Sequence, residues 1–328
     1  MRIPDTGFRH LLRERLYLNG SHFIAVLPIG RREGRWVKRI LLQLDTDKHP
    51  SAFDAIAAYD AGAEVVYGYG GVRAEEVRDL VYGAIFTRGP KDLHNTAIWI
   101  GGSDLPTAEA ILEAVRASFL GPLRVSVMLD AMGANTTAAA AVRKVVSAVP
   151  VRGARVAVVG GAGRVGSRVS ALLASEGAHL VLVEVPAVQD RARELGHNLG
   201  ERFGVRVEAV FPQDPAALRA ALDGVVALVS AGPPGVRTVP QDVWAAIPTL
   251  RVLADLNAVP PVGVEGIDVR DDGTQRDGRA CFGAIGIGNF KMRVHYACVA
   301  RLFERNDLVI DHEQAYEVAR QLLADAGP

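Results

Sequence analysis

Residues 156–166 read VAVVGGAGRVG, a short apolar strand that runs directly into a G-x-G-x-x-G turn. The glycines of the turn are Gly161, Gly163 and Gly166, and an amphipathic helix is expected from Ser167 to Ser175. Gly161 permits a tight turn, Gly163 lets a pyrophosphate approach the backbone, and Gly166 lets helix and strand pack closely. The free N–H groups at the helix start would hold the phosphates. The alternative is an ordinary strand-to-helix turn that binds nothing.

A carboxylate follows the next predicted strand at the position where dinucleotide-binding domains contact the adenosine ribose. Glu184 lies 23 positions after Gly161, and an acidic residue there accepts hydrogen bonds from the ribose hydroxyls. It would repel a 2′-phosphate, which favours NAD over NADP. Arg164 and Val165 complete the turn, and Arg164 is close enough in sequence to reach a phosphate. The alternative is a surface glutamate at the end of a strand.

Two further loops follow apolar strands and are candidates for the rest of a cofactor site. The first reads SAGPPG over residues 230–235, and its Ala231 and Gly232 are small enough for a cofactor to lie across the strand ends. The second contains Asn257, which could face a nicotinamide. An ordinary Gly/Pro turn and an asparagine that caps its own loop are the respective alternatives.

Composition limits the class of protein. The chain has 328 residues, 49% of them hydrophobic, which suits two α/β domains with buried parallel sheets. Its 37 basic and 37 acidic residues cancel, so no net charge favours nucleic acid or an anionic membrane. Cys281 and Cys298 lack metal spacing and suit free thiols in a reducing compartment. No apolar run reaches the ~20 residues of a membrane span, and no secretory signal is evident. The expectation is a cytoplasmic protein without a metal.

Alternating strand and helix patterns divide the chain into segments. We expect an extension at 1–37 that is poorly ordered, or else an oligomer arm or targeting segment. An N-terminal α/β domain at 38–149 and a Rossmann-type domain at 150–285 follow, and helices at 286–328 are expected to pack back on the first domain. The predicted strands are 38–44, 65–69, 84–87, 96–100, 124–129, 155–159, 180–183, 205–210, 227–230 and 251–255. The predicted helices are 51–61, 75–82, 107–118, 135–148, 289–305 and 312–324.

Three groups of residues outside the glycine turn are candidates for chemistry, although each, taken alone, is more often structural than catalytic. They are Asp45, Thr46, Asp47, Phe53 and Asp54 near the first strand, Asn135, Thr136 and Thr137 at a helix start, and the pair Lys291 and His295. The last two residues are four apart and share a helical face. Nucleophile-elbow, zinc-protease, C-x-x-C and Walker A motifs are missing, so nucleophilic, metal-hydrolytic and phosphoryl-transfer chemistry are poorly supported.

Several motifs together resemble the bacterial NAD(P)-dependent methylene-tetrahydromethanopterin dehydrogenases, a family that includes methylene-tetrahydrofolate-active members. The resemblance runs from about residue 38 to the end of the chain, and the ordered set is more specific than any one motif. The matching segments are LDTD at 44–47, PSAFD at 50–54, YGAIFTRG at 82–89, GANTTAAA at 133–140, the glycine turn, DLNAVPPVG at 255–263, GID at 266–268 and FGAIGIGNFK at 282–291.

The resemblance implies hydride transfer from a methylene group, held between two pterin nitrogens, to C4 of a nicotinamide. The product is a methenyl cation, and no proton moves in this step, which accounts for the lack of an evident acid–base pair. The pterin would bind between the domains, with Phe53 against its ring. The substrate-binding residues implied are Phe53, Asp45, Asp47, Asp54, Thr136 and Thr137, and the catalytic residues implied are Lys291 and His295. A homo-oligomer, trimeric or a multiple of it, is also implied.

Two features depart from the family pattern. Members that prefer NADP carry an arginine after the second strand, where this chain has Glu184, Val185 and Pro186. The N-terminal extension has no counterpart. Three alternatives stay open: the same reaction on methylene-tetrahydrofolate, a nucleotide-binding sensor without catalysis, and another small-molecule dehydrogenase. The last would need a general acid or base, for which Lys291 and His295 are the candidates.

Overall fold

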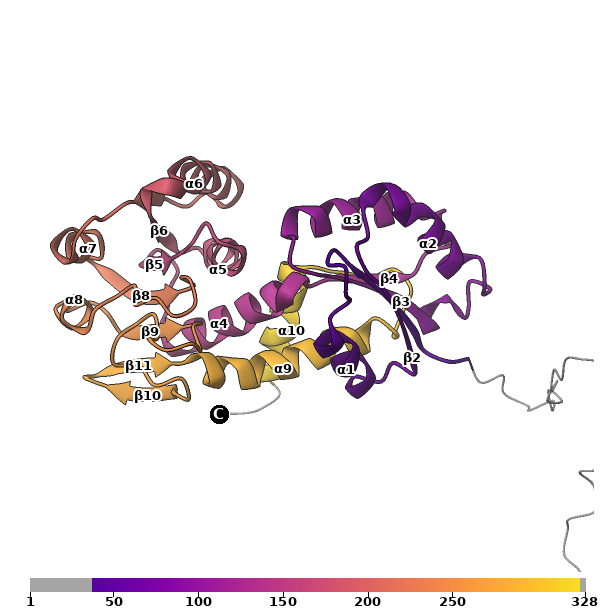
Figure 1. Ribbon diagram of the computed structural model, residues 1–328. Helices are drawn as coiled ribbons and strands as arrows, with labels where there is room; N and C mark the ends of the chain where they lie inside the picture. The colour runs from indigo at the N-terminus through magenta and orange to yellow at the C-terminus, as the bar shows by residue number, and fades with distance from the viewer. Residues whose placement is uncertain (1–36, 325–328) are drawn as a thin grey trace, which may run out of the picture. The chain divides into compact units, whose positions relative to one another are not determined.

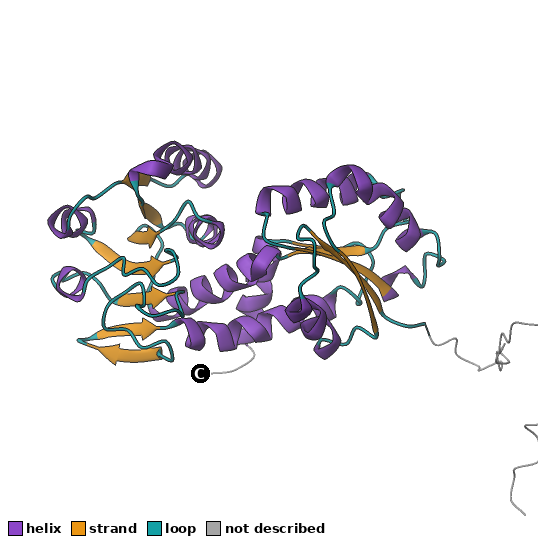
Figure 2. Ribbon diagram, viewed as in Figure 1, coloured by secondary structure: helices purple, strands orange, loops and turns teal. Residues whose placement is uncertain are grey.

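The computed structural model describes residues 37–324. The expectation for the extension at 1–37 therefore concerns, apart from Val37, residues outside the described range. Within that range the chain forms two α/β domains, each built on its own sheet (Figures 1 and 2). This confirms the predicted fold class. No helix of the described residues is long and apolar enough to cross a membrane.

The first sheet has five parallel strands in the order β12-β4-β3-β1-β2. They are β1 (Ile40–Asp45), β2 (Val65–Tyr69), β3 (Thr96–Gly101), β4 (Ser126–Leu129) and β12 (Val309–Ile310). The strand order reverses direction between β1 and β3. In open parallel sheets, ligands bind outside the carboxyl ends of the strands at such a switch point. The loops that follow β1 and β3 are therefore the expected location of a site.

Period-two side chains bury both faces of the first sheet. Leu42, Ile98 and Ile100 face one side and pack with α2 and α3, while Leu41 and Trp99 face the other side. The latter side is covered by α1, α4, α9 and α10. The helices that follow the first strands are α1 (Ala52–Asp60), α2 (Val77–Ile85), α3 (Leu105–Ala117) and α4 (Ala134–Ala148).

The second sheet has the strand order β10-β11-β9-β8-β5-β6-β7. Its strands are β5 (Arg155–Val159), β6 (His179–Val183), β7 (Val207–Val210), β8 (Val225–Ser230), β9 (Val252–Asp255), β10 (Asp272–Arg276) and β11 (Arg279–Phe282). Six of them are parallel, and β10 adds an antiparallel edge. The parallel part has the 3-2-1-4-5-6 order of a Rossmann domain, whose switch point lies between β5 and β8.

Helices cover both faces of the second sheet as well (Figure 2). One face, with Val156 and Val158, packs in the same core as α4, α5 and α9, and the other, with Ala157 and Val159, packs near α7 and α8. These helices are α5 (Arg164–Ser175), α6 (Gln189–Phe203), α7 (Pro215–Ala221) and α8 (Gln241–Ala245). Single 3-10 turns occur at Ala74–Glu76, Leu93–Asn95, Ala131–Gly133 and Pro186–Val188.

The end of the chain returns to the first domain. Helix α9 (Ala284–Arg301) packs against α4 and α1, and α10 (His312–Ala324) packs against α4 and α9 (Figure 1). Between them, β12 pairs in parallel with β4. The side chain of Ser126 joins the two segments, because its Oγ donates to the carbonyl of Arg305 and accepts from the N–H of Leu308.

Two predicted elements were wrong. The strand expected at 84–87 is the end of α2, because Ala84 and Ile85 extend the apolar helical face begun by Val77 and Val81. The helix expected from residue 289 begins five residues earlier, at Ala284. Its glycines looked like a loop, but Gly286 serves close packing instead: a Cβ there would lie 2.1 Å from the carbonyl oxygen of Asp271.

Candidate functional site

The glycine turn after β5 has the shape of a phosphate-binding turn. A Cβ on Gly166 would lie 2.0 Å from the carbonyl oxygen of Gly160, so helix α5 approaches the strand as closely as backbones allow. Since α5 begins at Arg164, the N–H groups of Arg164, Val165 and Gly166 have no acceptor within the helix. These three donors and the helix dipole fit a diphosphate.

The turn meets a second loop at the switch point of the sheet. Gly160 has φ +72°, and a Cβ there would lie 2.7 Å from the carbonyl oxygen of Ala231 and 3.1 Å from Cα of Gly232. A Cβ on Gly232 would in turn lie 2.7 Å from Cγ2 of Thr238. Glycine at 160 and at 232 is therefore required for the two loops to converge. This places the predicted residues Ala231 and Gly232 beside the glycine turn.

Glu184 folds back against the turn rather than facing solvent. Its Oε1 accepts a 2.5 Å hydrogen bond from the N–H of Ala162. Burial raises the pKa of its carboxyl group, while the bond from Ala162 and the charge of Arg191 oppose that rise. Glu184 is therefore a half-buried carboxylate bonded to the turn, and its contact with a ribose stays a prediction.

The side chains of Asn257 and Arg164 both have protein partners in the structure. The side chain of Asn257 accepts from the N–H of Val259 and donates to the carbonyl of Pro261, so it holds its own loop. The guanidinium of Arg164 donates from Nη1 to the carbonyl of Ser103 at 2.7 Å and contacts Sδ of Met132 at 3.0 Å. Both of these partners of Arg164 belong to the first domain.

At the switch point of the first sheet, the loops after β1 and β3 form a tightly bonded group that we call the β1 corner, consisting of Asp45, Thr46, Asp47, Gly102 and Ser103. Asp45 accepts from the N–H of Asp47, and Asp47 accepts from both the N–H and the hydroxyl of Ser103. Gly102 has φ +98°, and a Cβ there would lie 2.0 Å from Oγ1 of Thr46. The corner thus has a single backbone arrangement.

The β1 corner also fixes the start of helix α1. The second carboxylate oxygen of Asp45 accepts from the N–H of Ser51, and the hydroxyl of Ser51 caps the helix by accepting from the N–H of Asp54. Phe53 and Asp54 occupy the first turn of this helix. Phe53 is 55% exposed although it is a large apolar side chain, whereas Asp54 is buried. An exposed aromatic ring beside a buried carboxyl group is typical of a binding site.

Helix α9 brings Lys291 to the same place. Its Nζ lies 5.0 Å from the centroid of the Phe53 ring. Gly133, with φ +66°, makes room for it, since a Cβ there would lie 3.2 Å from Nζ. Among the described residues, the hydrogen-bond partner of Nζ is the sulfur of Met292 at 3.8 Å, a weak acceptor. The ammonium group therefore keeps donors for a ligand.

Behind Lys291 lies a buried acid–imidazole pair. Oδ2 of Asp130 accepts from the Thr136 hydroxyl at 2.7 Å and lies 3.1 Å from Nδ1 of His295. The backbone N–H groups of Asn135 and Thr136 donate to Oδ1. His295 is completely buried, its ring packs against the edge of Trp99, and its Nε2 has no partner among the described residues. His295 therefore acts through Asp130 rather than as an exposed group.

The charges of this cluster shift one another. Burial raises the pKa of Asp54 to about 7, the negative charge of Asp130 adds to the rise, and Lys291 opposes it. Burial lowers the pKa of Lys291, with Asp130 and Asp54 opposing. For Asp130, burial favours the neutral form, but the bonds and charge of His295, with Lys291 and Thr136, hold its pKa below the usual range. Asp54 is therefore the carboxyl group of the cluster that changes charge near neutral pH.

Asp54→Asn should stabilise the protein at pH 8 by ~1–3 kcal/mol relative to wild type. The folded pKa of about 7 exceeds the ordinary aspartate pKa of 3.8, so the folded state binds more protons between these two pH values. Wild-type stability consequently falls as pH rises through this window, and the variant escapes that loss. Urea unfolding of both proteins from pH 4 to 8 measures it.

The matched control is Asp104→Asn, in the exposed cap of α3. Thr107 lowers the pKa of Asp104, so this carboxylate stays ionised from pH 4 to 8, and the difference between Asp104→Asn and wild type should not change with pH over that range. If the free energy of unfolding of Asp54→Asn differs from that of wild type by the same amount at every pH from 4 to 8, that result would contradict the raised pKa of a buried Asp54.

The structure brings most of the predicted first-domain residues together. Phe53, Asp54, Thr136, Lys291 and His295 form one contiguous cluster. Asp45 and Asp47 lie in the β1 corner that supports it, and Thr137 is half-buried next to Thr136 on α4. Sequence reasoning missed Asp130 and Trp99. Asp130 had a signal, because it ends a buried strand five residues before Asn135, whereas Trp99 reads as an ordinary core residue.

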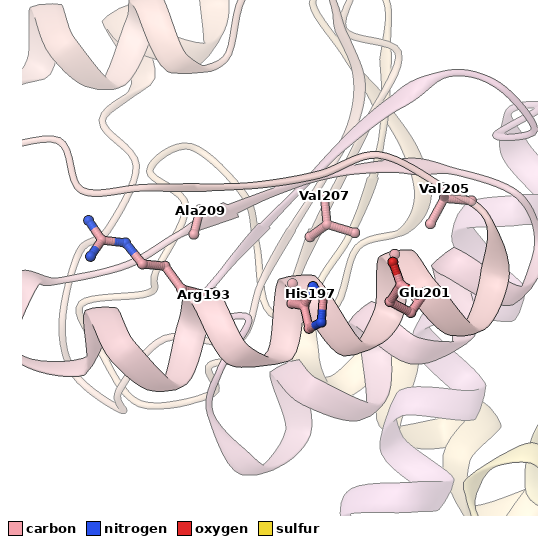
Figure 3. Close-up of a pocket in the computed structure, with 8 residues that line it drawn as sticks. Arg193, His197, Glu201, Val205, Val207 and Ala209 are labelled. Carbon is pink, nitrogen blue, oxygen red and sulfur yellow. The ribbon is translucent and has the colours of Figure 1, made fainter.

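A separate groove lies on the edge of the second sheet, between α6 and β7, with a volume of about 490 Å³ (Figure 3). Arg193, His197 and Glu201 follow one another along α6 opposite the strand. The helix carries Gly196 there, and a Cβ on it would lie 3.2 Å from Cγ1 of Val207. None of the predicted site residues lines this groove, and it is the hollow that glycine packing leaves beside an edge strand.

The fold and the glycine turn define a Rossmann-type dinucleotide-binding protein of two α/β domains. Among solved structures, shikimate 5-dehydrogenase from Listeria monocytogenes, in complex with shikimate and NAD, is similar with a TM-score of 0.50 and 11% identity. The match covers 87% of this chain and 96% of that one. At this identity the likeness concerns the fold alone.

The sequence comparisons are more specific. The family model "Methylene-tetrahydromethanopterin dehydrogenase, N-terminal" matches residues 52–132. The bifunctional protein MdtA of Methylorubrum extorquens is 42% identical, covering 87% of this chain and 99% of the relative. The NAD(P)-dependent methylenetetrahydromethanopterin dehydrogenase of the same organism is 34% identical with the same coverages. The chain belongs to the methylene-tetrahydromethanopterin dehydrogenase family, which confirms the resemblance seen in its motifs.

Proposed function

We propose that the protein is an NAD(P)-dependent dehydrogenase that oxidises methylene-tetrahydromethanopterin to the methenyl form during C1 (formaldehyde) oxidation. The observation that carries the proposal is the cluster of Phe53, Asp54 and Lys291 at the carboxyl edge of the first sheet. The β1 corner connects this cluster to the cofactor turn, because Ser103 of the corner accepts a hydrogen bond from Arg164. Family membership supplies the substrate class. The nicotinamide, when bound, supplies the hydride acceptor.

On the cofactor side, the chain contributes binding and orientation. The N–H groups at the start of α5 would hold the diphosphate, and Glu184, at the end of β6 beside the turn, would accept from the ribose. Ala231 and Gly232 leave the switch point open for the rest of the cofactor. These contacts fix one of the two reacting rings.

On the pterin side, Phe53 offers a flat apolar surface to the ring and Lys291 offers hydrogen-bond donors beside it. Hydride departure leaves positive charge on the pterin. The ionised carboxylates of Asp130 and Asp54 lie near enough to shift the pKa of Lys291, and they offset the charge of that ammonium group. Catalysis then rests on holding two rings at reacting distance, with no proton transfer required of His295.

The test is the initial rate of NAD and NADP reduction with methylene-tetrahydromethanopterin and with methylene-tetrahydrofolate, in one matched assay. Turnover with the methanopterin substrate supports the proposal. Turnover with the folate alone keeps the mechanism but changes the substrate. Nucleotide binding without turnover of either pterin would replace the proposal with a sensor.

Cofactor preference is expected to depend on Glu184. The double variant Glu184→Ala/Val185→Arg should raise the ratio of kcat/KM for NADP to that for NAD at least about tenfold, because it replaces a repelling carboxylate by a phosphate-binding guanidinium. Val185 is 62% exposed, so an arginine fits without disturbing the core. Steady-state kinetics with both cofactors measures the ratio.

Glu184→Gln is the matched control, since an amide oxygen can keep the bond from Ala162 while removing the charge. It should move the ratio part of the way. An unchanged ratio in both variants would remove Glu184 from the ribose site.

Assembly and location follow from the family in the same way. We propose a cytoplasmic homo-oligomer, trimeric or a multiple of it. Sedimentation of the full chain over a tenfold concentration range distinguishes a trimer from a monomer.

A further inference from the structure

Helix α5 carries two arginines, one turn apart, that reach into the first domain. Nε of Arg168 donates to Oδ1 of Asn135 at 3.2 Å, and its guanidinium also pairs with Glu109 on α3. The Arg168 side chain is 15% exposed and acts as a fixed anchor. Arg164 is exposed, and its contact with Ser103 is a single hydrogen bond from the same helix. The two contacts therefore differ in how readily they break.

A continuous set of hydrogen bonds leads from Arg164 to the first turn of α1. The carbonyl of Ser103 accepts from Arg164, while the N–H and hydroxyl of Ser103 donate to Asp47 at 3.0 and 2.6 Å. Asp47 donates its N–H to Asp45 at 2.8 Å, and Asp45 accepts from Ser51, the cap of α1. The bonds from Ser103 to Ser51 all end on the carboxylates of Asp45 and Asp47, so they form one connected network.

This series of hydrogen bonds is anchored at both ends. At one end, Arg164 is the first residue of α5, and its own N–H is one of the three donors offered to a diphosphate. At the other end, the cap at Ser51 sets the position of Phe53 and Asp54. Beside Arg164, Met132 is held at φ +49° with its sulfur against the guanidinium, an uncommon conformation for a side chain of this size.

We propose that Arg164 is a positioning residue that ties the cofactor turn to the β1 corner, so that NAD(P) binding orders residues 45–54, which end with Phe53 and Asp54 in the first turn of α1, and tightens pterin binding. The inference rests on the proposed function for the identity of the second ligand. A bound diphosphate immobilises the first turn of α5, and Arg164 transmits that order through Ser103. By linkage, the pterin then tightens NAD(P) binding by the same factor.

A different response of Arg164 to the cofactor would have the opposite effect on the β1 corner. If Arg164 instead leaves Ser103 to pair with the diphosphate, cofactor binding releases the β1 corner. The loop at 45–54 would then exchange its amide hydrogens faster with cofactor than without it. The two arrangements are therefore separated by the direction of one measurement.

Hydrogen exchange of peptides covering residues 45–54, with and without NADH, tests the proposal without any pterin. Wild type should exchange more slowly with NADH, and Arg164→Gln should show no such protection at saturating NADH. Asp47→Asn interrupts the same series of hydrogen bonds at a residue that does not touch the cofactor turn, and it should also lose the protection. Equal protection in wild type and both variants, or faster exchange in wild type, overturns the proposal.

Kinetics provide the second readout. Arg164→Gln should raise KM for the pterin about five- to tenfold and raise Kd for NADH by a smaller factor. A larger rise in Kd than in KM would make Arg164 a phosphate ligand instead. The double variant Arg164→Gln/Asp47→Asn should raise KM for the pterin little more than either single variant does, because both substitutions interrupt the same series of hydrogen bonds. Wild type that turns over neither pterin removes the proposed function, whereas the exchange result stands independently.

Discussion

Lys291→Met should lower kcat/KM for the pterin at least about 100-fold, which corresponds to ~2.7 kcal/mol of transition-state stabilisation. Methionine keeps the length and apolar stem of lysine but removes the donors that lie over Phe53. The loss should fall on the pterin kinetics and leave NADH affinity close to wild type. Steady-state kinetics together with fluorescence titration of NADH measures both.

The control is Lys144→Met. Lys144 also places its Nζ over an aromatic ring, at 5.5 Å from the Phe290 centroid, but pairs with Asp272 away from the cluster. It should change stability without changing pterin kinetics. Lys291→Met removes the positive charge near the buried carboxyl groups of Asp54 and Asp130, which could destabilise the fold. The double variant Lys291→Met/Asp54→Asn removes one of these carboxyl groups and controls for that loss of stability. A drop of less than threefold in both Lys291 variants would contradict the proposed role.

Gly166→Ala should weaken NAD(P) binding at least about 100-fold, or ~2.7 kcal/mol. The new Cβ would lie 2.0 Å from the carbonyl oxygen of Gly160 and 2.9 Å from Cα of Gly161, both backbone atoms that cannot swing aside. The turn must therefore open, and the N–H groups at the start of α5 would no longer point toward the same diphosphate position. Isothermal titration with NADH and with NADPH measures the change.

Two alanine controls bracket this effect. At Gly163 the nearest atom to a Cβ is 3.1 Å away, so Gly163→Ala should cost less. Gly83 lies in α2 with nothing within 4 Å of a Cβ, and Gly83→Ala should stabilise the helix by ~0.5–1 kcal/mol. NADH binding by Gly166→Ala that stays within threefold of wild type would show that the turn adapts.

The cofactor half of the site could be predicted from the sequence because its signals are local. A strand, three glycines and a helix fix the turn, and Glu184 follows at a set distance. The packing behind it was less visible. Gly283 and Gly286 read as loop residues, although each serves close contact with the 268–271 segment at the start of α9.

The pterin-side cluster required knowledge of which strand ends meet. Asp45, Asp130 and Lys291 come from three distant parts of the chain, and no periodicity links them. The hairpin of β10 and β11 was missed because its polar edge strand lacks an alternating pattern, yet Asp277 and Gly278 had the sequence of a two-residue turn. In contrast, the misassigned strand at 84–87 shows that a run of three apolar residues alone does not distinguish a strand from a helix end.

The origin of β12 has a consequence for how the chain folds during synthesis. This strand completes the first sheet but lies after the whole Rossmann domain, so β4 keeps an open edge until residues 309–310 leave the ribosome. Until then Ser126 lacks both of its partners from the 305–308 segment. The Rossmann domain is contiguous and can form first, as its strands emerge. We therefore expect the first sheet to be completed last, although most of its strands are translated first.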